Sequence, residues 1–189
     1  SADDHGRIYR EKGIITAFRE AGFHTTFISN QRPNHSFIDI FGKEADEWKF
    51  IKEESKRNNM YDDEMIKTVN DIINKKRKKE LIVLHTYGSH FNYRERYRPD
   101  EAVFTPDNAS EAKASNRQQL LNAYDNSIRN TDHFLSLLIR ELNRSGAISA
   151  MIYTSDHGEN IFDDSRRLFL HASPIPSYYE LHVPLLVWL

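Results

Sequence analysis

Apolar residues along this chain follow two patterns, one with helical spacing and one of short continuous runs. Helical spacing, with apolar side chains returning every three or four positions, predicts helices at residues 11–21, 62–79 and 115–143. Short runs of β-branched, aromatic and aliphatic residues predict strands at residues 23–29, 81–85, 150–154 and 183–189. The unbroken apolar run at 81–85 is typical of a central strand covered on both faces.

The alternation of helices and strands predicts an α/β sandwich with a mainly parallel sheet. In residues 34–59 a few apolar residues are scattered among charged ones, so we expect a segment on the surface that contains a short helix or strand. The helix at 62–79 is expected to begin at Asp62 or Asp63 as N-cap. It ends in the basic run 75–79, interpreted as a solvated helix end, with contact to an anionic membrane surface as the alternative.

The segment Ser155-Asp156-His157-Gly158 follows a predicted strand and places a carboxylate beside an imidazole. Neighbours in a continuing strand point to opposite faces, whereas a turn at the glycine lets both side chains converge. Carboxylate oxygen and imidazole nitrogen suit zinc or manganese, and the carboxyl end of a strand is a usual ligand site in α/β folds. The alternative is a polar turn in which Asp156 only caps the loop.

Composition limits the class of protein further. The 189 residues carry a net charge of −2, which argues against nucleic acid as a partner. Without cysteine, disulfides and thiolate metal sites are excluded, and no apolar run reaches the length of a membrane-spanning helix. Because the chain stops within an apolar strand pattern, we expect it to be a piece of a larger protein.

The motif and its surroundings resemble the bacterial phosphoethanolamine transferases of the alkaline phosphatase superfamily. The matching residues are Tyr153 and Ser155-Asp156-His157-Gly158-Glu159, Leu170-His171, Gly88-Ser89-His90, and Tyr93 with Arg96-Tyr97. Asn160 replaces a usual serine, Ala172 a usual glycine, and Arg98 is inserted before Pro99. The resemblance implies an alkaline-phosphatase-like three-layer sandwich, incomplete at both ends, with residues 1–189 forming one partial catalytic domain.

The resemblance also implies roles for individual residues. Asp156 and His157 would hold zinc, with manganese the less favoured ion. His90 and His171 would serve a second zinc, or bind and protonate the phosphoryl donor and leaving group. Asn30 and Gln31 would bind a phosphate or ethanolamine group. His85, Asp125 and Asp132 are expected to be structural.

The activity implied for the parent protein is transfer of phosphoethanolamine from phosphatidylethanolamine to lipid A or a lipopolysaccharide sugar, through a threonine-bound intermediate. Such a protein would be anchored in the inner membrane by a missing N-terminal domain, with its catalytic domain in the periplasm. The family's glutamate ligand and threonine nucleophile have no match here, so we expect this chain alone to be inactive and to hold zinc weakly. Alternatives are a sulfatase-like hydrolase, a phosphoglycerol transferase, or a non-catalytic binding module.

Overall fold

A computed structural model of the protein describes residues 12–33, 37–54 and 61–189. The chain forms two compact units, residues 1–87 and 88–189, and each is described by itself. The expectation of a single partial domain stays a prediction. In the part of the chain that the structure describes, no helix is both long enough and apolar enough to cross a membrane.

The first unit is built on a three-stranded parallel sheet, as the alternating pattern predicted. The strand order is β2-β1-β3, and the bounds are His24–Ser29 for β1, Glu47–Phe50 for β2 and Glu80–His85 for β3. β1 is therefore the central strand of this sheet, where residues 81–85 were expected; among the described residues of this unit β3 pairs with β1, and all its residues are half-buried. β2 accounts for part of the segment 34–59, whose other predicted features lie partly outside the described residues.

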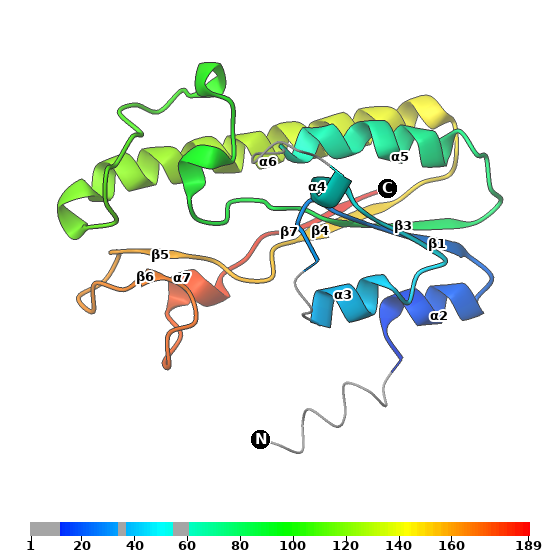
Figure 1. The fold of residues 1–189 in the computed structure, drawn as a ribbon, viewed down its shortest axis with the longest axis horizontal. Helices are drawn as coiled ribbons and strands as arrows, with labels where there is room; N and C mark the ends of the chain where they lie inside the picture. Colours follow the sequence, from blue (N-terminus) through cyan, green and yellow to red (C-terminus); the bar gives the residue numbers. More distant parts are fainter. Residues whose placement is uncertain (1–11, 34–36, 55–60) are drawn as a thin grey trace. The chain divides into compact units, whose positions relative to one another are not determined.

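Helices cover both faces of this sheet, α2 and α3 on one and α5 on the other (Figure 1). The bounds are Ile14–Glu20 for α2, Phe37–Gly42 for α3, Ile51–Glu54 for α4, Asp62–Glu64 for the 3-10 helix η1 and Met65–Ile73 for α5. α5 buries the predicted apolar stripe through Met65, Val69 and Ile72. Burial of this stripe supplies the driving force that holds the helix on the sheet. The helix ends at Ile73, six residues before the predicted end at Lys79.

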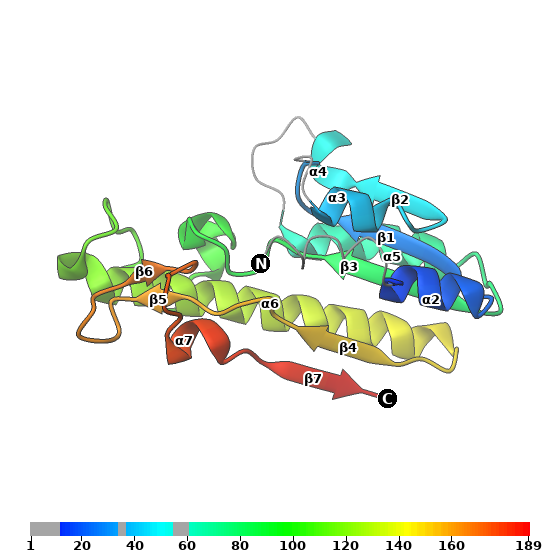
Figure 2. The ribbon, with the colours of Figure 1, turned by 90° about the horizontal axis from the view of Figure 1, so that it is seen from below.

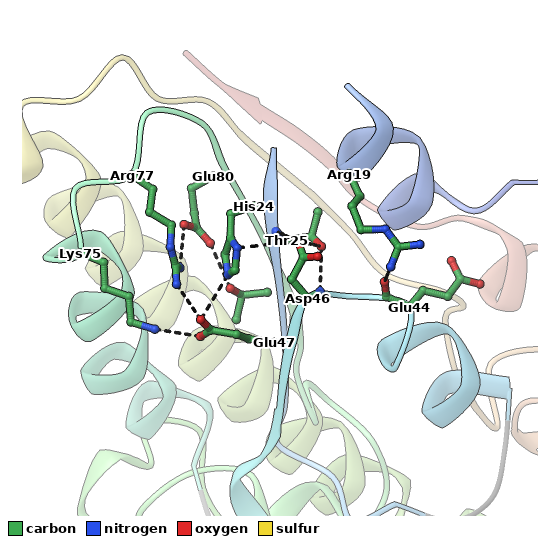
Figure 3. Close-up of polar contacts among 10 residues, drawn as sticks. Arg19, His24, Thr25, Glu44, Asp46, Glu47, Lys75, Arg77 and Glu80 are labelled. Carbon is green, nitrogen blue, oxygen red and sulfur yellow. Dashed lines mark hydrogen bonds and ion pairs between the residues drawn. The ribbon is translucent and has the colours of Figure 1, made fainter. Parts of the chain in front are cut away.

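The basic run after α5 pairs with the sheet rather than extending the helix (Figure 3). Lys75 Nζ lies 2.8 Å and Arg77 Nη2 2.6 Å from the carboxylate of Glu47, at the start of β2. Arg77 also contacts Glu80, and His24 Nε2 lies 3.2 Å from Glu47. Lys75 remains exposed, as interpreted for this run, whereas Arg77 is half-buried between the carboxylates of Glu47 and Glu80; neither residue lies in the helix, which ends at Ile73.

Glu47 should make the stability of the first unit depend on acidic pH. Hydrogen bonding by Lys75, with the charge and hydrogen bond of Arg77, lowers the pKa of Glu47 to about 2. A pKa below the unfolded value means that its contribution is complete above about pH 4.5 and disappears as pH falls toward 2. Because the side chain is 41% exposed, we expect Glu47→Gln to cost less than about 1 kcal/mol at pH 7. Urea unfolding at pH 7 and pH 3 checks this; an equal cost at both would contradict it.

The second unit is organised by the long helix α6, Arg117–Ser145, which ends at Gly146 in the left-handed conformation, φ 68°. Glycine commonly ends helices in this conformation. Short 3-10 helices precede it at Tyr93–Glu95 (η2), Pro99–Glu101 (η3) and Ala114–Asn116 (η4). After it come β4 Met151–Thr154, β5 Asn160–Ile161, β6 Phe169–Leu170, α7 Tyr178–Leu181 and β7 Leu185–Trp188 (Figure 2). Residues 160–179 thus hold two short strands and the start of a helix.

The strand pairs of the second unit are antiparallel, β4 with β7 and β5 with β6. The predicted strands at 150–154 and 183–189 are confirmed; the apolar composition of 150–154 favours burial, but Ile152 is 72% exposed. Its partner Val187 and the neighbouring Leu185 are exposed as well. One face of the β4–β7 pair is therefore apolar and uncovered.

α6 holds the preceding loop through a row of buried asparagines spaced one helical turn apart. Asn122 donates to the carbonyl of Pro106, Asn126 to that of Phe104 and Asn130 to that of Arg96, at 2.8–2.9 Å. Side chains four residues apart share one face of a helix, so all three asparagines can hydrogen-bond to the backbone of the loop that lies along that face. The structural role expected of Asp125 and Asp132 is wrong, because both are exposed and the asparagines make these ties.

Candidate metal and phosphoryl site

The turn after β4 brings Asp156 and His157 together, as the motif predicted. Asp156 Oδ2 lies 3.7 Å from His157 Nε2. Two donors on one tetrahedral zinc with bonds of about 2.1 Å lie roughly 3.4 Å apart, so the pair fits a shared ion. Gly158 is needed for a different reason from the one expected. A Cβ there would lie 1.9 Å from the Tyr179 carbonyl oxygen, and the Gly158 amide donates to the Glu180 carbonyl at 2.8 Å.

The other two predicted site histidines, His171 and His90, lie near this turn. The ring centroid of His171, directly after β6, lies 3.8 Å from that of His157 and 6.2 Å from that of His90. Asp156, His157 and His171 line a hollow of about 270 Å³ whose walls include Ala172, Leu181 and Val183. The structure therefore gathers all four side chains that the sequence placed at one site.

Aromatic packing of the neighbouring residue positions His90 near His171. Phe91, the next residue, packs edge-on against Phe169 at 5.3 Å and against Tyr93 at 5.4 Å. Tyr93 is fully buried with Leu120, Ala123 and Ile161. The segments that bear His90 and His171 thus share one core with α6.

In all three imidazoles the Nδ1 atom contacts an oxygen. The Nδ1 atom of His157 lies 2.9 Å from the Gly158 carbonyl oxygen, that of His171 lies 2.9 Å from Glu159 Oε1, and that of His90 contacts the Phe91 carbonyl. Carbonyl and carboxylate oxygens accept hydrogen bonds, so Nδ1 carries the hydrogen in each ring. Metal-binding histidines typically donate from their second ring nitrogen to such an oxygen, and His157 and His171 have this arrangement.

Glu159 is the residue that the sequence interpretation left without a role. Its side chain is only 4% exposed, and its carboxylate contacts both His171 and the hydroxyl of Tyr93. Potential ligand atoms of His157, Glu159 and His171 lie within 4.8 Å of one another, a spacing that metal ions use. The sequence signal that could have identified Glu159 is its position in the same short motif as Asp156 and His157.

The predicted substrate residues Asn30 and Gln31 lie in the first unit, at the carboxyl end of β1. Asn30 is fully buried, and its amide donates to Asp62 Oδ1 at 2.8 Å. Asp62 also accepts from the Tyr87 amide, so it joins two strand ends instead of capping the helix as expected. Gln31 is half-buried. Binding of substrate by Asn30 and Gln31 stays a prediction.

His85 has the hydrogen-bonded ring expected of a structural histidine. Its Nδ1 atom lies 2.9 Å from Ser29 Oγ, and its ring stacks on Phe27 with centroids 6.2 Å apart. Ser29 is the register partner of His85, so the contact joins the ends of β1 and β3. His85 therefore supports the rim of the sheet.

In the second unit, a cluster of imidazoles and carboxylates thus follows the strands of an α/β fold. The sequence profile of the sulfatase family matches residues 2–189. The chain belongs to the sulfatase family.

Curated relatives are named phosphoethanolamine transferases. The Kdo(2)-lipid A phosphoethanolamine 7''-transferase of Salmonella typhimurium is 28% identical over 188 residues, which cover 97% of this chain and 32% of that protein. Phosphoethanolamine transferase EptA of the same organism is 33% identical over 135 residues, covering 68% of this chain and 24% of EptA. The chain spans about a third or less of the length of these relatives.

Solved structures agree with this fold. The soluble domain of lipooligosaccharide phosphoethanolamine transferase A from Neisseria meningitidis has 30% identity and a TM-score of 0.77, covering 90% of this chain and 52% of that one. The C-terminal periplasmic domain of EptC from Escherichia coli, solved in complex with zinc, has 22% identity and a TM-score of 0.84, covering 94% and 52%. The predicted alkaline-phosphatase-like α/β fold is thereby confirmed.

Proposed function

We propose that the whole protein containing this chain transfers phosphoethanolamine from phosphatidylethanolamine to lipid A or a lipopolysaccharide sugar. The gathering of His90, Asp156, His157 and His171 around one hollow carries the proposal. The names of the curated relatives supply the chemical group and the acceptor class. Periplasmic placement and anchoring in the inner membrane belong to the same proposal.

Within this proposal, Asp156 and His157 hold a zinc ion. The donor pair is of the kind that zinc accepts, and the Nδ1 hydrogen bond to Gly158 leaves His157 Nε2 available. When bound, zinc stabilises negative charge and lowers the pKa of a coordinated hydroxyl group. Asp156, 85% exposed on its side chain, reaches the ion from the open side. Nothing in the donor set favours manganese over zinc.

His90 and His171 hold the phosphoryl group of the donor and supply a proton to the leaving group. In each ring Nδ1 is engaged by an oxygen, so the proton that the ring donates is carried on Nε2. A phosphoryl group needs donors on more than one side as charge moves between its oxygens. Asn30 and Gln31 bind the phosphate or the ethanolamine. The threonine nucleophile and the glutamate ligand come from outside this chain.

A reconstituted assay tests the proposal. The full-length protein is incubated with phosphatidylethanolamine vesicles and lipid A, and lipid A is analysed by mass spectrometry together with released diacylglycerol. We expect lipid A to gain phosphoethanolamine, zinc chelation to stop the gain, and added zinc to restore it. Turnover only with phosphatidylglycerol or a sulfate ester would identify the alternative family chemistries, and would overturn the proposal.

The isolated chain should show neither turnover nor tight zinc binding. Two ligands from one turn leave a tetrahedral ion with half of its shell supplied by water, which weakens binding. Isothermal titration with zinc and a donor-cleavage assay on residues 1–189 measure both properties. Turnover of a phosphoethanolamine donor by this polypeptide would show that the nucleophile lies within it.

A further inference from the structure

A buried carboxylate lies between two hydrogen-bond donors beside the histidine cluster. Glu159 Oε2 accepts from the Tyr93 hydroxyl at 3.2 Å, and Glu159 Oε1 accepts from His171 Nδ1 at 2.9 Å. A carboxylate this deeply buried is costly unless donors compensate it. The proposed zinc and phosphoryl chemistry makes no use of Glu159, although its contacts reach a residue that this chemistry does use.

The contact to Glu159 determines what His171 can offer. With the Nδ1 hydrogen directed at the carboxylate, Nε2 is the nitrogen that can meet the phosphoryl group, and rotation of the ring would break a charge-assisted bond. His171 lines the hollow next to His157. Glu159 thus selects both the tautomer and the orientation of the ring at the site.

Tyr93 prevents the carboxylate from turning away. Its side chain is fully buried, and its ring packs edge-on against Phe91 and Tyr124, with centroids 5.4 and 5.1 Å apart. Burial raises the pKa of Tyr93, and the neighbouring Glu159 carboxylate raises it further, so the hydroxyl stays a donor. The line Tyr93–Glu159–His171 is therefore anchored in the core of the second unit.

The backbone on either side of His171 is constrained as well. Leu170 and Ala172 have φ of 65° and 64°, a region that residues other than glycine rarely adopt. Such conformations persist only where the surroundings hold them. Asn160, the replacement for the family's usual serine, donates to the Leu170 carbonyl at 2.8 Å and to Glu180 at 2.6 Å. His171 is thus held through its backbone and through its ring.

We propose that Glu159, anchored by Tyr93, is a positioning residue that holds the His171 ring with its hydrogen on Nδ1, so that Nε2 faces the phosphoryl group of the donor. The inference rests on the proposed transferase function. Direct metal binding by Glu159 is the alternative, because potential ligand atoms of His157, Glu159 and His171 lie within 4.8 Å of one another, and the zinc content of the variants separates the two.

The test compares Glu159→Ala, Glu159→Gln and Tyr93→Phe in the full-length protein, with Asp125→Asn as an exposed carboxylate-to-amide control. Loss of a group that orients a site histidine costs about 10- to 100-fold, so we expect that drop in kcat for Glu159→Ala, with KM and bound zinc unchanged. Glu159→Gln keeps an oxygen that accepts from Nδ1 and should recover most of the rate. Tyr93→Phe should fall between the two, and the control should match the wild type.

A second readout needs no activity. Nitrogen-15 chemical shifts of labelled histidine, assigned with His171→Gln, report which ring nitrogen carries the hydrogen. We expect the Nδ1–H form at His171 in the wild type and in Glu159→Gln, and its loss in Glu159→Ala. An unchanged tautomer in Glu159→Ala, zinc loss in Glu159→Gln, or a raised KM at constant kcat would each overturn the inference. A protein without transferase activity that keeps the tautomer pattern would refute only the proposed function.

Discussion

Replacing His157 with alanine in the full-length protein should abolish stoichiometric zinc and reduce transfer of phosphoethanolamine by about 1000-fold, since metal stabilisation of charge amounts to several kcal/mol and each 1.36 kcal/mol is a factor of ten. The reason lies in the turn after β4, where His157 Nε2 and Asp156 Oδ2 are 3.7 Å apart. Zinc content by inductively coupled plasma mass spectrometry and initial rates measure the two losses together.

The matched control for this substitution is His133→Ala. His133 lies exposed on α6, so the same loss of an imidazole should leave zinc content and rate unchanged. Full zinc content in the His157→Ala protein would remove His157 from the metal site. Rate loss with retained zinc would assign it to the phosphoryl group instead.

Replacing Asn126 with leucine should destabilise the second unit by about 3 kcal/mol, because buried donors and acceptors left unpaired cost about 1–3 kcal/mol each. Asn126 Oδ1 accepts from the amides of Val103 and Phe104 at 2.9 and 3.0 Å, and its amide donates to the Phe104 carbonyl. The side chain is 2% exposed, so leucine fills the space without replacing these bonds. Urea unfolding followed by circular dichroism gives the free energy of unfolding.

Asn143→Leu is the control, because Asn143 is exposed near the end of the same helix. It should change the free energy of unfolding by less than about 0.5 kcal/mol. Equal costs at positions 126 and 143 would mean that helix propensity, rather than the loop contacts, explains the result.

Local patterns in the sequence were sufficient to predict several helices and strands and the turn that bears Asp156 and His157. Apolar spacing placed α5 and α6, β-branched runs placed β1 and β3, and the glycine after Asp156-His157 indicated a turn at which both side chains converge. These features depend on contacts between residues close in the chain, which a sequence pattern expresses directly. The family resemblance then named His90 and His171, which lie far from the motif in sequence.

Only the tertiary structure revealed which strand is central, which residues tie α6 to its loop, and what Glu159 does. β1 became central because β2, in a segment without a clear pattern, pairs with its other edge. Asn122, Asn126 and Asn130 replaced the expected aspartates because an amide both donates to and accepts from a loop backbone, whereas a carboxylate only accepts. Glu159 meets Tyr93 across 66 residues of sequence, and a hydrogen bond between such distant residues exists only once packing has brought them together.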